Sequence, residues 1–384
     1  MTEGLSCNVA LRTLPSPIHM QSQRGRRIAW SGIGPLFCVF FLIAFGLGYP
    51  ILNRFDPRQT PGLSDVKVYA AIVSGTTVTE ATVSEAGHVG FRVLIPWIAR
   101  PFYLLARGRI ASWDPVMFGL LIADSLFVAG TAAIIVLLGT RVVGADQSSS
   151  HTIGVVGALL YLVNFAVPNL RLVGLVDAGE GFFLLAVLWC LVEGQLWALP
   201  AIGVLGTMSK ESFIPFSVVL TFAWWLVSRF DDNRESKRES QSFPQDETWI
   251  LASWVLSLGT MIGLQRAMSG QFISPLQFGV SLHLGHDYWR HFGASLRDRN
   301  LWYIFLWLLP TAIPNLKNLS RLWLISIGAT CATAFVLDAY YGGAPGTVGR
   351  ALFSIAGPAL SLSSAMLLLR IAGPSRNVDC KRVG

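Results

Sequence analysis

Residues 115–140 read PVMFGLLIADSLFVAGTAAIIVLLGT, and Asp124 is the single charged residue in this stretch. A helix needs about 20 consecutive apolar residues to cross the hydrocarbon core of a bilayer. A run of this length with one charge is typical of a transmembrane helix. The run is continuous rather than alternately apolar and polar, which argues against a strand of an outer-membrane barrel.

The rest of the chain has the same character. Of its 384 residues, 53% are apolar and 13% are charged, whereas a soluble domain carries about 25% charged residues. This composition excludes a soluble single-core enzyme, a disordered chain and a coiled coil. It predicts an all-α fold, a polytopic integral membrane helix bundle of about ten spans. The expected spans are residues 28–50, 115–140, 152–168, 181–197, 198–209, 212–228, 248–265, 301–316, 322–339 and 351–371.

Positive charges indicate how the bundle is oriented. Arg24, Arg26 and Arg27 precede the first apolar run, Ile28–Tyr49, which we expect to act as an uncleaved signal anchor. The positive-inside rule then places both termini in the cytoplasm, and the expected location is the bacterial inner (plasma) membrane. The net charge of +7 lies in short clusters between apolar runs. We therefore interpret it as a topology signal and expect no nucleic-acid partner.

One charged stretch divides the chain. Residues 229–247 (RFDDNRESKRESQSFPQDE) contain few apolar residues, which is typical of a flexible linker. The predicted organisation is a cytoplasmic tail (1–27), an N-terminal membrane module (28–228), a cytoplasmic linker (229–247), a C-terminal membrane module (248–371) and a second cytoplasmic tail (372–384).

The first external loop, 51–112, is long and partly apolar. Asp65–Thr76 predicts a short helix, and Phe91–Arg109 predicts an amphipathic helix in the membrane interface. A transmembrane interpretation of Phe91–Arg109 is less favourable, because three arginines at membrane depth are costly. At 100° per residue, these arginines are expected to share one helix face: Arg92, Arg100 and Arg107.

Polar residues of the external loops form the candidate site. Arginine and lysine bind phosphate, and a carboxylate can take a proton from an acceptor hydroxyl. The catalytic candidates are Asp65, Asp177 and Glu211. The candidates for substrate binding are Tyr69, Arg92, Lys210, His286, Asp287 and Arg350.

Each candidate also has a structural interpretation. Asp65 would cap the short helix, Arg92 would extend to the interface, and Lys210 with Glu211 would form an ion pair in a tight turn. His286 would be a solvated loop residue, and Arg350 an interface anchor.

Three acids have open roles. Asp177 and Glu180 favour a helix N-terminus, and a divalent metal there is an open alternative; no metal site is assigned. Asp124 would carry protons in a transporter or hydrogen-bond a neighbouring helix. The second role is favoured, because no other charge is expected at mid-span.

Several short motifs resemble those of one enzyme family. The motifs are SDVKVY (Ser64–Tyr69), FRVLIPWIAR (Phe91–Arg100), Asp177 at the start of a span, SKES (Ser209–Ser212), and a late arginine before an apolar span with proline (Arg350–Pro358). The first two resemble the first-loop pattern of bacterial multi-spanning proteins related to the GT-C glycosyltransferases.

The resemblance implies a function. It implies a polyprenyl-phosphate-linked sugar as donor, an extracytoplasmic glycan, lipid or protein as acceptor, and an inverting transfer in contact with membrane lipid. It also implies that Asp65 is the base or a metal contact. Basic loop residues of the family contact the lipid phosphate, which implies this role for Arg92, Lys210 and Arg350.

The chain departs from the family in two ways, and other functions stay open. It lacks a DD, DE or DxD pair in the first loop, so the resemblance does not imply that the activity depends on a metal. It also lacks the large C-terminal soluble domain of some members, so the acceptor is not specified. The alternatives are a transporter or lipid-linked-glycan flippase, and a noncatalytic membrane subunit.

Overall fold

The fold is entirely helical over the part of the chain that the computed structural model describes. This part comprises residues 32–54, 64–76, 91–110, 112–141, 147–230, 243–269, 286–341 and 347–372. The predicted all-α class is confirmed. In chain order the elements are α1 (Ile33–Arg54), α2 (Ser64–Ser74), α4 (Leu94–Ala106), α5 (Pro115–Gly139), α6 (Gln147–Leu162), η2 (Val167–Arg171), α7 (Asp177–Glu193), η3 (Leu196–Ala198), α8 (Leu199–Ser209), α9 (Phe213–Phe230), α10 (Phe243–Ser269), α11 (His286–Leu296), α12 (Arg299–Phe305), α13 (Leu308–Ala312), η6 (Ile313–Asn318), α14 (Arg321–Tyr341) and α15 (Thr347–Ala372).

Among the described residues, six helices are long and apolar enough to cross a membrane. They are α1, α5, α9, α10, α14 and α15. Each coincides with a predicted span, and helices of this kind are what an integral membrane protein requires. The total of about ten crossings stays a prediction.

The other four predicted spans are shorter or broken. Helices α6, α7 and α8 have 16, 17 and 11 residues. The span predicted at 301–316 is wrong as a single helix, because α12, α13 and η6 divide it into pieces of seven, five and six residues. Pro310 and Pro314 lie in this stretch, and proline removes a backbone donor that a continuous helix needs.

Helix α5 forms the centre of the bundle. Its first turn is fixed by Asp114, whose side chain accepts hydrogen bonds from the backbone N–H groups of Val116 (2.8 Å) and Met117 (3.2 Å). A capping acid of this kind satisfies donors that the helix start would leave unpaired. Helices α1, α4, α6 and α7 pack around α5, which buries most of its length.

The C-terminal helices pack against those before the charged stretch 229–247. Helix α15 lies along α6 and α7, α14 along α9, and α10 along α8. Helix α9 extends to Phe230 and α10 begins at Phe243, so both ends of the predicted linker are helical. Arg229 and Glu247 form an ion pair between these two helices. Residues 231–242 lie outside the described part, and the division into two modules stays a prediction.

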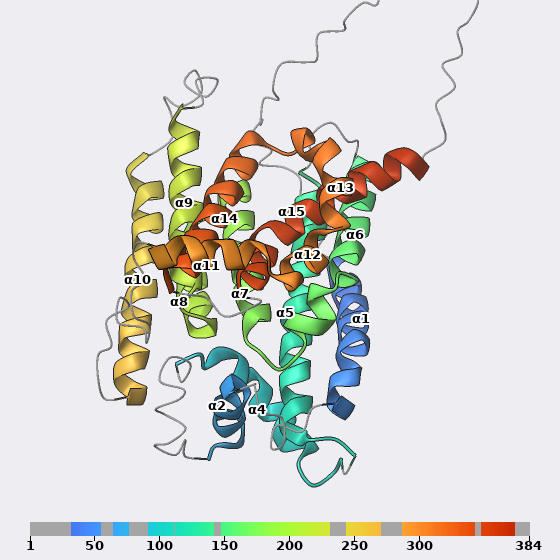
Figure 1. Cartoon of the computed structure of the whole chain (residues 1–384), viewed down its shortest axis with the longest axis vertical. Coiled ribbons are helices and arrows are strands. Elements are labelled where there is room, and N and C mark those ends of the chain that lie inside the picture. Colours follow the sequence, from blue (N-terminus) through green and yellow to red (C-terminus); the bar gives the residue numbers. More distant parts are fainter. Residues whose placement is uncertain are drawn as a thin grey trace, which may run out of the picture.

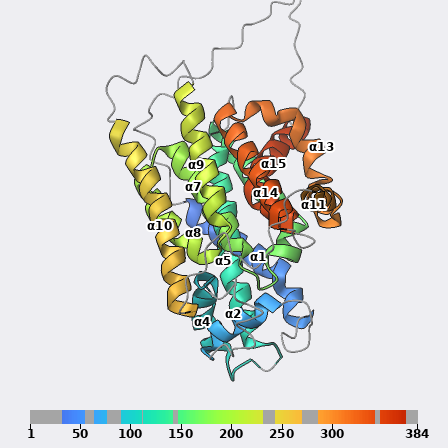
Figure 2. The same cartoon turned by 60° about the vertical axis from the view of Figure 1, so that its left-hand side comes forward.

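Two short helices gather at one end of the bundle. Figures 1 and 2 show α2 and α4 together below the ends of α7 and α8. The helix predicted at Asp65–Thr76 is confirmed by α2, and α4 confirms a helix within Phe91–Arg109. The predicted face of three arginines is wrong. Arg92 precedes α4, while Arg100 lies within the helix and Arg107 just after its end, both exposed.

Candidate functional site

Arg92 forms the first centre of the candidate site. Its Nε donates to Oε2 of Glu211 at 2.7 Å, and its Nη2 donates to Oε1 of the same carboxylate. Its Nη1 donates to the hydroxyl of Tyr69 at 3.0 Å and to Oδ2 of Asp65 at 3.3 Å. The two-pronged contact with Glu211 is the strongest geometry available to an arginine and a carboxylate. Every nitrogen of the guanidinium group is therefore engaged.

Electrostatics keeps Arg92 and Glu211 ionised. Burial by itself would lower the pKa of Arg92, but Glu211, Tyr69 and Asp65 together outweigh burial and raise it, with Glu211 the largest of the three. Burial by itself would raise the pKa of Glu211, but Arg92 and Lys210 together outweigh burial and lower that pKa below its usual range. Each group thus stabilises the charge of the other.

Helix α2 supplies Asp65 and Tyr69 to this centre from successive turns of one face. Tyr69 is fully buried, and burial raises the pKa of its phenol, so the hydroxyl stays neutral. The Asp65 side chain is 41% exposed, whereas that of Glu211 is 23% exposed. Asp65 is therefore the carboxylate of this centre that is most open to an approaching molecule.

Asp177 forms the second centre, in the first turn of α7. Lys210 Nζ lies 2.6 Å from its Oδ1, and Arg350 Nη1 lies 3.3 Å from its Oδ2. Lys210 Nζ also lies 3.2 Å from Oε2 of Glu180, which accepts a further hydrogen bond from Ser212. Asp177 and Glu180 are nearly or fully buried. Buried carboxylates need partners of this kind to remain ionised.

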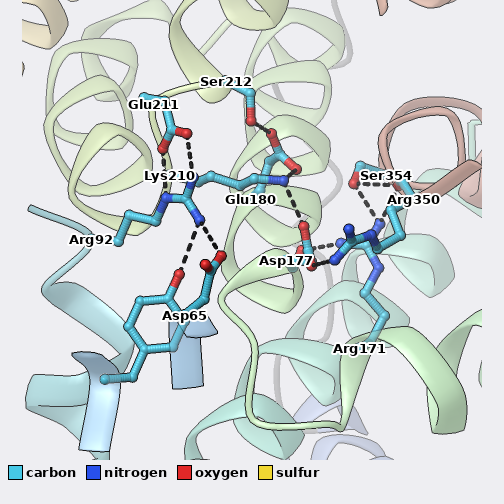
Figure 3. Close-up of polar contacts among 11 residues, drawn as sticks. Asp65, Arg92, Arg171, Asp177, Glu180, Lys210, Glu211, Ser212, Arg350 and Ser354 are labelled. Carbon is cyan, nitrogen blue, oxygen red and sulfur yellow. Dashed lines mark hydrogen bonds and ion pairs between the residues drawn. The ribbon is translucent and has the colours of Figure 1, made fainter. Parts of the chain in front are cut away.

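The turn between α8 and α9 joins the two centres. Lys210 extends to Asp177 and Glu180, whereas Glu211, the next residue, extends to Arg92 (Figure 3). Burial by itself would lower the pKa of Lys210, but Asp177 and Glu180 outweigh burial and raise it. Lys210 therefore stays protonated, and the turn holds α2 and α4 to α7.

Arg171 supports the second centre from beneath, and the sequence analysis missed it. The side chain is fully buried. It donates hydrogen bonds to the backbone carbonyls of Asp177 and Arg350 (3.0 Å for Arg350) and to the hydroxyl of Ser354. Arg171 thus links the first turns of α7 and α15 (Figure 3). An arginine between two apolar stretches was the signal that could have identified it.

Together these residues form one charged cluster. We define it as Asp65, Tyr69, Arg92, Arg171, Asp177, Glu180, Lys210, Glu211, Ser212, Arg350 and Ser354. Its four cations, Arg92, Arg171, Lys210 and Arg350, face four carboxylates. Residues separated by up to 289 positions in the chain therefore meet at one place, with their formal charges balanced.

The cluster contains most of the predicted site residues. Asp65, Tyr69, Arg92, Asp177, Lys210, Glu211 and Arg350 all belong to it. His286 and Asp287 open α11, but their side chains lie outside the described residues, so their predicted role is untested.

The residues of the second centre do not fit a divalent metal. In the parts of the chain with described side chains, there is no group of three or more histidine, cysteine or acidic residues that could hold one. Asp177 and Glu180, the acidic pair considered for a metal, both bind the Lys210 ammonium group. That cation occupies the position between the two carboxylates, so we derive no step through a metal.

Asp124 has charged neighbours after all. The residue is fully buried in α5, and Arg171 and Asp177 lie close enough to act on it electrostatically. The sequence did not predict either neighbour. Arg171 is the last residue of η2, which contains Pro168.

Comparisons with known proteins return nothing for this chain. No family model, curated protein or solved structure matches it. Function is therefore inferred from the charged cluster and from the motif resemblance, which stays a prediction.

Proposed function

We propose that this protein is a membrane glycosyltransferase that moves a sugar from a polyprenyl-phosphate donor to an extracytoplasmic acceptor. One observation carries the proposal most. Paired acids and bases from widely separated elements converge in one charged cluster (Figure 3), and one carboxylate of that cluster, Asp65, is 41% exposed. Polar groups held in place beside an apolar bundle suit a substrate with a charged head and a lipid tail.

Asp65 is the proposed general base. Its exposed carboxylate is held by Arg92, which also binds Tyr69 and Glu211. A base must reach the proton that it removes within hydrogen-bond distance. The partial exposure of Asp65 gives an acceptor hydroxyl access to that carboxylate, while Arg92 holds the carboxylate in position.

Lys210 and Arg350 are the proposed contacts of the donor phosphate. Their side chains are 18% and 24% exposed, and they converge on Asp177. We assign Arg92 to holding Asp65 and Glu211 rather than to the phosphate, because its nitrogens are all engaged. Positioned cations stabilise the negative charge that grows on a leaving phosphate.

The proposed reaction balances as follows. The acceptor oxygen forms a bond to the anomeric carbon while the bond from that carbon to the phosphate oxygen breaks. The bonding electrons leave on the polyprenyl phosphate, next to Lys210 and Arg350. The acceptor proton passes to Asp65. Most of the acceleration comes from holding the donor and acceptor in line.

The test uses purified protein in vesicles with radiolabelled polyprenyl-phosphate sugars and a membrane extract as acceptor. Wild type should release label from at least one donor. Arg350→Gln should slow the release of label tenfold or more. The control is Arg370→Gln, which replaces an exposed arginine at the far end of α15 and should release label at the wild-type rate. If wild type consumes no donor, the proposal fails, and a flippase or a noncatalytic subunit is favoured instead.

A further inference from the structure

Helix α4 has an exposed face that the charged cluster does not use. Trp97, Arg100, Pro101 and Leu104 line an open hollow of about 430 Å³ on this face. Their spacing of i, i+3, i+4 and i+7 makes one continuous stripe along the helix. A hollow of this volume is in the range of small-molecule sites.

The opposite face of α4 is fully occupied. Ile95, Ala99 and Tyr103 are buried, and α4 packs closely on α5. A Cβ at Gly119 of α5 would lie 2.6 Å from the carbonyl oxygen of Ala99, so the two backbones are in direct contact. The stripe with the hollow therefore faces away from the bundle, and α4 cannot rotate to bury it.

The stripe combines large apolar side chains with a cation. Trp97 is 50% exposed and Leu104 is 57% exposed, while Arg100 lies between them on the stripe. Large apolar groups exposed in this way mark an interaction surface. Tryptophan beside arginine at the end of membrane-spanning helices is the pattern of the bilayer interface.

Arg100 lies close to the C-terminal end of α2. A Cβ at Gly75, directly after α2, would lie only 2.9 Å from Arg100 Nη2. Gly75 has φ +72°, a conformation that glycine adopts without strain. The C-terminal end of a helix carries partial negative charge and attracts a cation. The guanidinium group therefore lies beside the C-terminal end of α2, at the edge of the hollow.

Charge identifies the ligand class. Residues 91–110 contain Arg92, Arg100, Arg107 and Arg109 and no acidic residue. Glu211 and Asp65 pair with Arg92, whereas Arg100, Arg107 and Arg109 are exposed. An exposed basic surface at the membrane interface attracts anionic lipid.

We infer that the hollow on α4 binds an anionic phospholipid, with its phosphate at Arg100 and an acyl chain along Trp97 and Leu104. This inference depends on the apolar helices of the bundle and not on the proposed transferase reaction. The bound lipid would cover the exposed tryptophan and hold α4, and with it Arg92, at the membrane surface.

Native mass spectrometry of the detergent-solubilised protein tests the inference. The protein is mixed with equal amounts of dioleoyl phosphatidylglycerol and dioleoyl phosphatidylcholine. Wild type should retain phosphatidylglycerol preferentially. Arg100→Gln should weaken that preference at least fivefold, and Arg100→Lys should keep most of it. Arg266→Gln removes an exposed arginine from the last turn of α10, outside the stripe, and should leave the preference unchanged.

Three results would overturn the inference. The first is an unchanged preference for phosphatidylglycerol in an Arg100→Gln protein that has the melting temperature of wild type. The second is retention of both lipids in equal amounts by wild type. The third is a dimer that Trp97→Ala abolishes, since a second copy of the chain would then cover this face. If Arg100→Gln has a lower melting temperature than wild type, Trp97→Ala is used in its place. Retention of phosphatidylglycerol by Trp97→Ala at the wild-type level then overturns the inference.

Discussion

At the scale of the residue, Arg92 is the point where three separate elements are connected. It binds a carboxylate from the α8–α9 turn and a carboxylate and a phenol from α2. A buried pair is costly to break, because removal of one partner leaves the other charge uncompensated. The ionic partners of Arg92 therefore stabilise the fold and also keep Asp65 in place.

Glu211→Gln should destabilise the protein near neutral pH by about 1–3 kcal/mol, because the hydrogen bonds from Arg92 would then be accepted by a neutral amide in place of a carboxylate. The pKa of Glu211 is lowered in the folded state. Its stabilising contribution is therefore present above the unfolded pKa of about 4.5 and is lost as the pH falls through the folded value. The difference in thermal midpoint between wild type and variant should shrink as the pH falls from 7 to 4.

The control for this prediction is Glu247→Gln. Glu247 forms an ion pair with Arg229, but both side chains are well exposed, and exposed pairs contribute little. This variant should melt close to wild type at each pH. A Glu211→Gln difference that stays constant down to pH 4 would contradict the assigned ionisation.

Arg171→Met should destabilise the protein by about 3–5 kcal/mol, the usual effect of removing one partner from a buried ionic network. It would remove the hydrogen bonds that Arg171 donates to the carbonyls of Asp177 and Arg350. Ser354→Ala removes one hydroxyl from the same contact and should cost about 1 kcal/mol. Chemical denaturation of the two variants measures the difference, and equal effects would show that Arg171 does not join α7 to α15.

The sequence predicts much of the site, but not its internal support. Asp65, Arg92, Lys210 and Glu211 stand out because charged residues between apolar runs are rare and conspicuous. Their pairing is not predictable, because a one-dimensional pattern does not say which external loops meet. Arg171 was missed because it follows the span predicted at 152–168, and only the fold directs its side chain inward.

At the scale of the element, local chemistry decides where helices begin and break. Helix α5 is predictable from its length, its apolar composition and the Asp114–Pro115 start. The stretch 301–316 is also apolar, yet it divides into three short helices. Hydropathy alone does not report the backbone donors that Pro310 and Pro314 remove, so the prediction of one span failed there.

Contact between α4 and α5 depends on Gly119. Gly119→Ala should destabilise the protein by about 1–3 kcal/mol, because the new methyl group would meet the Ala99 carbonyl at 2.6 Å and force the backbones apart. Gly46→Ala places a methyl group in open space within α1 and should be neutral or slightly stabilising. Thermal melts compare the two, and equal midpoints would contradict the close α4–α5 packing.

At the scale of the whole molecule, orientation in the membrane follows from charge asymmetry. The predicted topology places α2, α4 and the charged cluster outside the cytoplasm and the end of α9 inside. The arrangement of apolar helices agrees with a membrane bundle, but helices alone do not indicate which side is which. The sidedness is therefore a separate prediction.

Cysteine labelling in intact cells measures the sidedness. In a background without the five native cysteines, Arg109→Cys, near the end of α4, should react with a membrane-impermeant maleimide. Phe230→Cys, at the 75% exposed last residue of α9, should react only after the cells are permeabilised. The reverse pattern would place the charged cluster in the cytoplasm and contradict an extracytoplasmic acceptor.

The most direct test of the central claim is the transfer rate of Asp65→Asn measured together with donor binding. Asparagine keeps the size of the side chain and removes the base, and general bases contribute about 10²–10⁴-fold. We expect Asp65→Asn to bind the donor like wild type and to transfer sugar at least a hundredfold more slowly. The control is Asp246→Asn, which replaces an exposed acid on α10 and should transfer sugar at the wild-type rate. A transfer rate for Asp65→Asn within threefold of wild type would contradict the assignment of Asp65 as the base of the charged cluster.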